Sequence, residues 1–447
     1  MWGREPGGGP YHGGMTTPSL DPVTVHALDY RDFLLDSPSS FHAADLLAQR
    51  LVDVGFSRQD ETQPWDASPG GHVLVRDGAA MAWVVPETLD EGVGFRIVGA
   101  HTDSPAFKLK PTASTTTPDG WGQLGVEIYG GMIWNSWLDR ELALAGRVLT
   151  RDGREVLVRT GAIARIPQLA IHLDRGVNDA LSLDPQKDLH PVWTVDEADA
   201  DVMDRVARDA GLDSAAEIIA HDLFTIPSQG PAFFGSDGQF VASGRQDNLS
   251  SVHAGLTALE RLTASGLPTH GDVLVLACFN HEEVGSATRS GAAGPILEDV
   301  LHRTAWALGC DAEATARMIR ASSCISSDAG HSVHPNYPTH HDPDTRPVMG
   351  RGPMLKLNAK ERYASDAEGS ALWVRACEAA GVAHQVFVSN NAVPCGTTIG
   401  PLTATRLGIL TVDVGIGLLS MHSAREMSHV ADLHALSLAL GAYWAGA

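Results

Sequence analysis

The chain has 447 residues, of which 43% are hydrophobic, so a sizeable core is expected and wholesale disorder is excluded. The chain contains 32 lysines and arginines and 54 aspartates and glutamates, which gives a net charge of −22. This charge argues against nucleic acid or an anionic membrane as a partner. No apolar run reaches the roughly 18 residues of a membrane-spanning helix. The N-terminal segment has glycine, proline and histidine where a secretory signal has an apolar run, so we expect a cytoplasmic protein.

The N-terminal quarter of the chain begins with a low-complexity segment and then shows helix and strand patterns. Residues 1–18 are rich in glycine and proline and are predicted to be a disordered extension, in which Met15 is an alternative start. Beyond it, periodicity and turn residues predict helices over residues 21–35 and 41–54 and strands over residues 72–76, 80–85 and 95–100.

The middle of the chain has a different texture, with more hairpin signals and less alternation of strands and helices. A strand is expected at 126–129, and two more at 147–150 and 155–159 flank Asp152-Gly153, a strong turn signal. Residues 185–220 are acidic and partly helical. We therefore predict four segments: the extension at 1–18, a catalytic domain in two parts at 19–109 and 242–447, and an inserted β-rich domain at 110–241 between them.

After Gly244 strands and helices alternate again. Helices are predicted at 249–264, 294–301 and 366–380 and from residue 430, and strands at 272–280, 322–327, 354–357, 385–389 and 409–414. Apolar strands alternating with helices indicate a mostly parallel sheet covered on both faces. The predicted fold class is α/β, a mostly parallel sheet flanked by helices, with the β-rich domain inserted into it.

Side chains of the kind that bind metals follow several of these predicted strands or precede a helix. Ligands of such sheets bind beyond the carboxyl ends of the strands, so these residues are expected to converge at one edge. They are His101, Asp103, Asp247, Glu282, Glu283, Asp328 and His422. Histidines and carboxylates without a thiolate suit two divalent ions of the zinc, manganese or cobalt kind.

A pair of divalent ions would give this set a definite chemistry. Two ions about 3.5–4 Å apart need a bridging carboxylate, and together they turn a bridging water into an attacking hydroxide. A further carboxylate must carry the proton from water to the leaving group. The adjacent Glu282 and Glu283 can supply a ligand and a proton carrier. Taken singly, each residue also has an ordinary structural interpretation, such as a helix cap for Asp247; only the set as a whole favours the metal site.

Six longer stretches carry a resemblance to a known family. They are VGAHTDSPAFKLKP at 98–111, GRQDNLSS at 244–251, NHEEVGSATRSGA at 280–292, SSDAGHSVHPNYP at 326–338, GPMLKLNAKERYAS at 352–365 and SMHSAREM at 420–427. In these stretches, and over nearly the whole chain from about residue 20, the sequence resembles the aspartyl aminopeptidase family of co-catalytic metallopeptidases.

The resemblance implies a role for each candidate ligand. His101 and Asp328 would hold one ion, Glu283 and His422 would hold the other, and Asp247 would bridge the two. Zinc is favoured, and manganese or cobalt is an alternative at one position.

The resemblance also implies how the proton moves. Glu282 would be the general base and then the general acid, while Asp103 would orient the His101 ring. The peptide bond between Asp247 and Asn248 is expected to be cis, as in the family.

Substrate preference is implied in the same way. The family removes an N-terminal Asp or Glu from short peptides, which requires a cation in the pocket. Lys356 is the matching position, Tyr363 would donate a hydroxyl nearby, and His331 would contact the substrate or stabilise the oxyanion.

Assembly rests on the resemblance alone. The inserted block would be a dimerisation domain, and His172 within it would reach the active site of a neighbouring subunit. The family forms a tetrahedral dodecamer, built from dimers, with an enclosed lumen that limits substrates to short peptides.

Some features depart from the family or remain open. Asn280 stands where the family often has Asp, and we interpret His334, His340 and His341 as a mobile loop rather than an extra metal site. The five scattered cysteines are expected to be reduced, with Cys395 as the candidate for a reactive thiol. Two other functions stay open: a related metallopeptidase of broader or neutral specificity, and a non-catalytic shell or peptide-binding protein that kept the fold.

Overall fold

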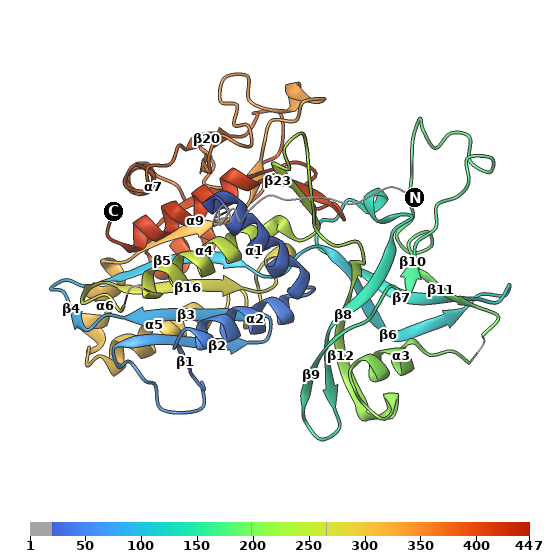
Figure 1. Ribbon diagram of the computed structural model, residues 1–447, viewed down its shortest axis with the longest axis horizontal. Coiled ribbons are helices and arrows are strands. Elements are labelled where there is room, and N and C mark those ends of the chain that lie inside the picture. Colours follow the sequence, from blue (N-terminus) through green and yellow to red (C-terminus); the bar gives the residue numbers. More distant parts are fainter. Residues whose placement is uncertain (1–19, 198, 265) are drawn as a thin grey trace, which may run out of the picture.

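The computed structural model describes residues 20–447, except 198 and 265, as two bodies side by side: a larger α/β body and a smaller β-rich body (Figure 1). The extension predicted at 1–18, with Met15, lies outside the described residues. Within the described part of the chain, no helix is both long and apolar enough to cross a membrane.

The larger body is built on a nine-stranded sheet. The four neighbouring strands at its centre, β16, β5, β17 and β21, run parallel, and β3, β19 and β20 run against them. In spatial order the strands are β1 (Ser57–Arg58), β2 (Gly70–Arg76), β3 (Ala79–Val85), β16 (Val273–Phe279), β5 (Phe95–His101), β17 (Ser323–Ser327), β21 (Leu410–Gly415), β19 (Met354–Leu357) and β20 (Gln385–Val388).

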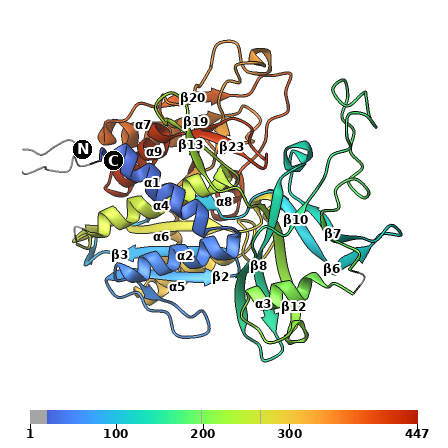
Figure 2. The same cartoon turned by 45° about the vertical axis from the view of Figure 1, so that its right-hand side comes forward.

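Helices cover both faces of this sheet, and Figure 2 shows α1, α2 and α4 of the first face in front of the strands. The first face packs against α1 (Pro22–Asp36), α2 (Ser40–Asp53), α4 (Gln246–Ala264), α7 (Ala367–Ala380) and α9 (Val430–Trp444). The second face packs against α5 (Ile296–Ala307), α6 (Ala312–Arg320) and α8 (Gly400–Leu407).

The central strand β16 is apolar on both sides because each side faces a separate core. In β16, Leu274 and Leu276 point into the core beneath α4 and α9, whereas Val273 and Val275 point into the core beneath α5. This is the continuous apolar pattern expected of a strand covered on both faces.

The smaller body is a seven-stranded antiparallel sheet with its own hydrophobic core, to which the short helix α3 (Val202–Asp209) contributes Val202 and Val206. Its strands in spatial order are β10 (Ala164–Arg165), β11 (Val192–Val195), β7 (Trp121–Tyr129), β6 (Ala106–Thr116), β12 (Ile218–Pro227), β8 (Glu141–Thr150) and β9 (Glu155–Arg159).

Short elements complete the structure. A three-stranded sheet of β13 (Ala232–Phe234), β14 (Phe240–Ser243) and β23 (Glu426–His429) brings the returning chain back to the larger body. The pairs β4 (Thr88–Leu89) with β15 (His270–Gly271) and β18 (Gly330–His331) with β22 (Gly417–Leu418) are two residues long. The 3₁₀ turns are η1 (Trp134–Trp137), η2 (Ala215–Glu217), η3 (Glu282–Val284) and η4 (Pro338–His340).

The predicted fold class is confirmed: a mostly parallel sheet between helices, and a separate antiparallel β-rich domain. The hairpin at Asp152-Gly153 is present as β8 and β9. The long strands β6 and β12 were not predicted. In β6, Pro111 interrupts the strand pattern, and it lies where the register with β7 shifts between Leu109 and Ser114, a place where a strand tolerates proline.

Candidate active site

Three neighbouring parallel strands deliver the candidate site residues to one edge of the large sheet. His101 is the last residue of β5, and it lies beside Phe279 at the end of β16. The η3 turn that carries Glu282 and Glu283 follows β16, and Asp328 directly follows β17. Because the three strands are adjacent and parallel, their polar ends are brought together, as expected from the sequence.

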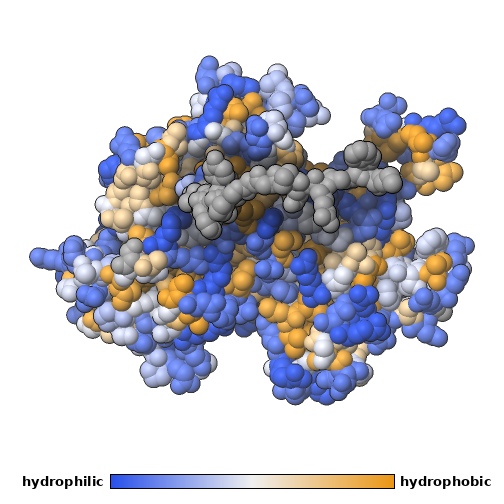
Figure 3. Space-filling view, in the orientation of Figure 1, coloured by the Kyte–Doolittle hydropathy of each residue, from blue (hydrophilic) through white to orange (hydrophobic). Residues whose placement is uncertain are grey.

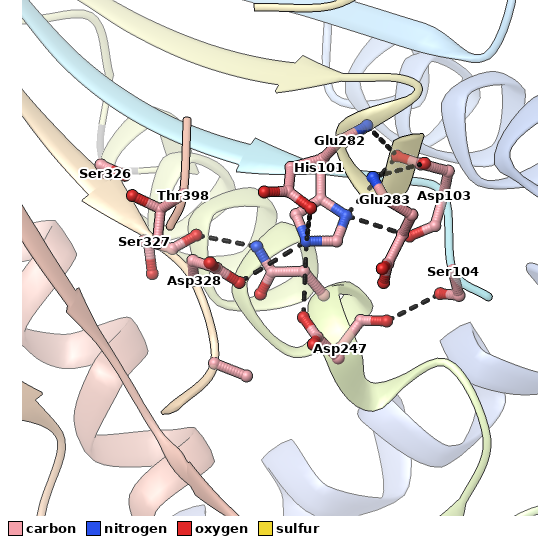
Figure 4. A network of polar contacts seen from close by, with 12 residues as sticks. His101, Asp103, Ser104, Asp247, Glu282, Glu283, Ser326, Ser327, Asp328 and Thr398 are labelled. Carbon is pink, nitrogen blue, oxygen red and sulfur yellow. Dashed lines mark hydrogen bonds and ion pairs between the residues drawn. The ribbon is translucent and has the colours of Figure 1, made fainter. Parts of the chain in front are cut away.

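The described residues include three groups of candidate ligands, and the first contains His101, Asp247 and Asp328 (Figure 4). A further group, His101 with Glu282 and Glu283, shares one residue with each of the other two. The Nε2 atom of His101 lies 3.4 Å from Oδ1 of Asp247 and 3.5 Å from Oδ1 of Asp328. All three side chains are buried or nearly so.

The second group contains Asp247, Glu283 and His422. The Nε2 atom of His422 lies 3.3 Å from Oδ2 of Asp247 and 3.4 Å from Oε2 of Glu283. Asp247 therefore turns one carboxylate oxygen to each histidine, which is the geometry of a shared ligand.

These separations fit a pair of metal ions better than direct hydrogen bonds. N–H···O bonds are typically about 2.7–3.2 Å long, whereas atoms bound at about 2.0–2.2 Å to one tetrahedral ion lie about 3.3–3.6 Å apart. In addition, Oδ1 of Asp247 and Oε1 of Glu283 are buried and have no hydrogen-bond partner among the described residues. Buried carboxylate oxygens without partners are costly, and a cation in each of the first and second groups would remove that cost.

The charges of the site show the same need for cations. Burial and the nearby Asp247 charge raise the pKa of Glu283 well above its ordinary range. Burial, together with Asp328 and Asp247, raises the pKa of Glu282 to about 7 although His101 opposes the shift. Carboxylates this close and this buried resist ionising together unless a cation lies between them.

Both histidine rings are held by backbone carbonyls so that Nε2 faces the carboxylates. Nδ1 of His101 lies 3.0 Å from the carbonyl oxygen of Asp103 and 3.6 Å from its carboxylate. Nδ1 of His422 lies 3.0 Å from the carbonyl oxygen of Gly131. A proton on Nδ1, donated to the carbonyl, leaves the Nε2 lone pair free for a metal.

The Asp103 carboxylate organises the turn that carries both glutamates. It accepts the backbone N–H of Glu282 at 3.0 Å, that of Glu283 at 3.2 Å and the hydroxyl of Tyr129 at 2.7 Å. Burial and the Asp103 charge raise the pKa of Tyr129 far above its ordinary range, so this hydroxyl stays protonated and donates.

A second buried carboxylate, Glu426, organises the remaining ligands and was not singled out from the sequence. One of its oxygens accepts the N–H groups of Gln246 and Asp247 at 2.8 and 3.2 Å, and the other accepts that of His422 at 2.8 Å. Burial raises the pKa of Glu426 to about 8. The only signal available was its position in the 420–427 motif.

The segment around the shared aspartate has the expected backbone. The Asp247-Asn248 peptide bond is cis. The carbonyl oxygen of Asp247 accepts the hydroxyl of Ser104 at 2.7 Å, and the Asn248 amide donates to the Ser327 carbonyl at 2.8 Å.

Among the predicted substrate residues, Lys356 lies against the first ligand group. Its side chain is 1% exposed, and Nζ donates to the Ala329 carbonyl at 2.8 Å and lies 3.6 Å from Oδ2 of Asp328. The ring of Tyr363 covers the ammonium, with 5.3 Å between Nζ and the ring centroid. Tyr363 and His331 both line a cavity of about 200 Å³.

The other predicted residues lie around this cavity or away from the site. His340, His341 and Cys395 line the same cavity, and Nε2 of His341 accepts the backbone N–H of His334. A nitrogen engaged in this way is not free for a metal. Asn280 uses its side-chain oxygen to accept the N–H of His281.

His172 lies apart from the ligand groups of its own chain. It is exposed in the long loop between β10 and β11, which projects from the smaller body in Figure 1. Apolar side chains of this loop are also exposed, and Figure 3 shows hydrophobic residues at its tip. They include Leu169 (60%), Ile171 (46%) and Leu173 (75%).

Comparison with known families gives a match over almost the whole chain. The model of the family described as "Aminopeptidase I zinc metalloprotease (M18)" matches residues 33–444. A probable M18 family aminopeptidase 2 of Streptomyces avermitilis is 48% identical over 425 residues, 94% of this chain and 98% of that protein. A relative with the same description from Pseudomonas paraeruginosa is 39% identical over 426 residues, 93% of this chain and 96% of that protein.

Solved structures of similar chains have the same fold. A chain in the cryo-EM structure of the Ape4 and Nbr1 complex aligns with a TM-score of 0.91 and 31% identity, covering 94% of this chain and 86% of that one. The mApe1 dodecamer of S. cerevisiae aligns with a TM-score of 0.83 and 26% identity, covering 94% of this chain and 96% of that one.

Proposed function

The chain belongs to the aminopeptidase I (M18) family of zinc metalloproteases, and from this premise we propose that it removes an N-terminal Asp or Glu from short peptides. Membership carries the coarser statement that it is a metal-dependent aminopeptidase. The acidic preference, the number of ions and the roles of single residues are our proposal.

One observation carries the proposed chemistry: two histidine–carboxylate groups share Asp247. Glu282 forms the third group with His101 and Glu283, but it lies farther from the His101 nitrogen than Asp247 and Asp328 do. Its Oε2 lies 3.9 Å from Nε2 of His101, and its side chain is 16% exposed. Glu282 is thus near enough to serve a reacting water and open enough to receive one.

The proposed reaction divides the work among the chain's own residues. Two divalent ions, zinc by family, would supply the charge that acidifies water and polarises the scissile carbonyl. Glu282 takes one proton from the attacking water and gives it to the leaving amine nitrogen, so that a C–O bond forms as the C–N bond breaks. The residues that would hold the ions are His101, Asp328, Glu283, His422 and Asp247.

The proposed preference for acidic residues rests on Lys356. A buried ammonium next to a ligand carboxylate is a fixed positive charge, and in a protein of net charge −22 an acidic substrate needs such a local attraction. His331 and Tyr363 would contact the same end of the substrate, since both line the neighbouring cavity.

The test compares hydrolysis of Asp-, Glu- and Leu-peptides of equal length by the wild type and Lys356→Met. We expect the wild type to prefer the acidic substrates and Lys356→Met to lose that preference while it keeps its metal. Lys360→Met, the same change at an exposed lysine of the same segment, is the matched control. A wild type that cleaves Leu-peptides faster would refute the acidic pocket and favour a neutral metallopeptidase. Absence of hydrolysis with any peptide, at full metal content, would favour a non-catalytic protein.

We also propose that the smaller body is a dimerisation domain of a tetrahedral dodecamer, with His172 reaching a neighbour's active site. The S. cerevisiae relative is a dodecamer, and the loop of His172 exposes Leu173 and Ile171, which are suited to burial between subunits. Light scattering of the wild type and of Leu173→Asp tests the assembly. A wild-type monomer would refute it.

A further inference from the structure

A short segment at the end of β7 brings the smaller body against the catalytic centre. Tyr129 is the last residue of β7, and Gly130 and Gly131 follow it. We propose that the segment Tyr129–Gly131 is a positioning element of the catalytic site, in which the Tyr129 hydroxyl holds the turn of Glu282 and Glu283 through Asp103. This inference rests on the proposed peptidase function.

The first link runs from Tyr129 to both glutamates. Its hydroxyl donates to Oδ2 of Asp103 at 2.7 Å, and that same oxygen accepts the N–H of Glu283 at 3.2 Å. The other oxygen of Asp103 accepts the N–H of Glu282 at 3.0 Å. Because hydrogen bonds hold both oxygens of Asp103, this carboxylate fixes the orientation of the backbone that carries Glu282, the proposed proton carrier, and Glu283, a candidate ligand.

The second link runs from the same segment to His422. The Gly131 carbonyl lies 3.0 Å from Nδ1 of His422, and two residues later the N–H of Ile133 donates to the carbonyl of His422 at 2.9 Å. The ring and the backbone of this candidate ligand are therefore both held by the chain that leaves β7.

Gly130 allows this close approach. Gly130 has a φ of +76°, and a Cβ built on it would lie 3.1 Å from Cβ of Glu283. A Cβ on Gly131 would lie 3.5 Å from Nδ1 of His422. The segment packs against two candidate ligands of the second group, Glu283 and His422, so its placement is coupled to theirs.

The hydroxyl of Tyr129 can be separated from the packing of its ring. The ring packs edge-on against Phe224 with 5.2 Å between centroids, a contact that phenylalanine retains. Tyr129→Phe therefore removes one hydrogen bond to Asp103 and leaves the fold of the smaller body unchanged.

The test measures kcat, KM and zinc affinity of Tyr129→Phe, the last by competition with a chromogenic chelator. We expect kcat at saturating zinc to fall about 10- to 100-fold, the usual effect of losing a hydrogen bond behind the ligands, with KM changed less than about twofold. Zinc affinity should fall as well. Tyr443→Phe is the matched control, because Tyr443 is also buried and donates to the Ser323 carbonyl at 2.8 Å away from the site. It should lose thermal stability without losing kcat.

A double variant shows whether Tyr129 acts through Asp103. If it does, Tyr129→Phe added to Asp103→Asn should lower kcat less than twofold further. A kcat of Tyr129→Phe within twofold of wild type, or a full additional loss in the double variant, would overturn the inference. An inactive wild type would instead overturn the proposed function, so the two failures can be told apart.

Discussion

Replacing Glu282 with glutamine separates proton transfer from metal binding. Glu282 Oε2 lies 3.9 Å from the nearest histidine nitrogen, outside the 3.3–3.5 Å spacing of the two groups that share Asp247. Glutamine keeps the size of the side chain but cannot accept a proton from water. Glu282→Gln should therefore keep its metal and lose turnover.

The size of the loss in kcat follows from the role of Glu282. A positioned general acid–base contributes about 10²- to 10⁴-fold to the rate, which corresponds to about 2.7–5.4 kcal/mol in the activation barrier.

The same substitution should increase the stability of the metal-free protein. Burial raises the pKa of Glu282 to about 7, so the ionised carboxylate destabilises the metal-free fold as pH rises from the unfolded value of about 4.5 to 7. At pH 8, metal-free Glu282→Gln should be more stable by about 3 kcal/mol.

The assay compares Glu282→Gln with its neighbour Glu283→Gln. Glu283 lies 3.4 Å from Nε2 of His422 with a side chain 3% exposed, so its neutralisation should lower metal content as well as rate. Metal analysis after dialysis, kcat with an acidic peptide and urea denaturation of the metal-free proteins give the three quantities. Loss of metal from both variants alike, or a full rate in Glu282→Gln, would refute the division of roles.

Three further outcomes are expected. In the metal-loaded enzyme kcat/KM should fall with decreasing pH because the general base, Glu282, must be ionised. Because the cations lower the pKa of Glu282, the midpoint of the fall should lie between about 4.3 and 7. A flat profile over pH 5–7 would contradict this. Burial lowers the pKa of His26 to about 2, so its contribution to the free energy of unfolding is fully present above about pH 6.5 and is lost as the pH falls from there. Urea denaturation should show a loss of about 2 kcal/mol between pH 7 and 5, and His26→Gln should remove this loss. Asp413→Ala leaves the buried hydroxyls of Ser326 and Thr398 without their acceptor and should cost about 2–4 kcal/mol in urea denaturation, whereas a loss below 1 kcal/mol would show that the network contributes little.

The ends of buried strands were the part of the site that sequence could predict. Strands apolar throughout, such as β16, are recognisable by pattern, and the first polar residues after them must lie at the sheet edge. This pattern predicts that His101, Glu283 and Asp328 lie at one edge, and the structure brings His101 together with each of the other two in candidate ligand groups.

Asp103 was the one supporting residue named from the sequence, whereas Glu426 and Tyr129 were beyond the reach of sequence reasoning. Glu426 and Tyr129 act through backbone N–H groups and a carboxylate that are distant along the chain, and such contacts leave no periodic signal. Tyr129 was seen only as the end of a predicted strand in another domain. The strand β6 was not predicted because Pro111 normally indicates the end of a strand. Here it lies where the register of β6 with β7 is irregular, and this pairing is not visible in the sequence.

The order of strands in the large sheet has a consequence for how the protein is made. β16 lies between β3 and β5, and both of these precede it in the chain, with the whole smaller body synthesised in the interval. Until β16 emerges from the ribosome, β3 and β5 each present an unpaired edge, which is a template for aggregation. His422 lies later still in the chain, so the set of candidate ligands is complete only when almost the whole chain has been synthesised.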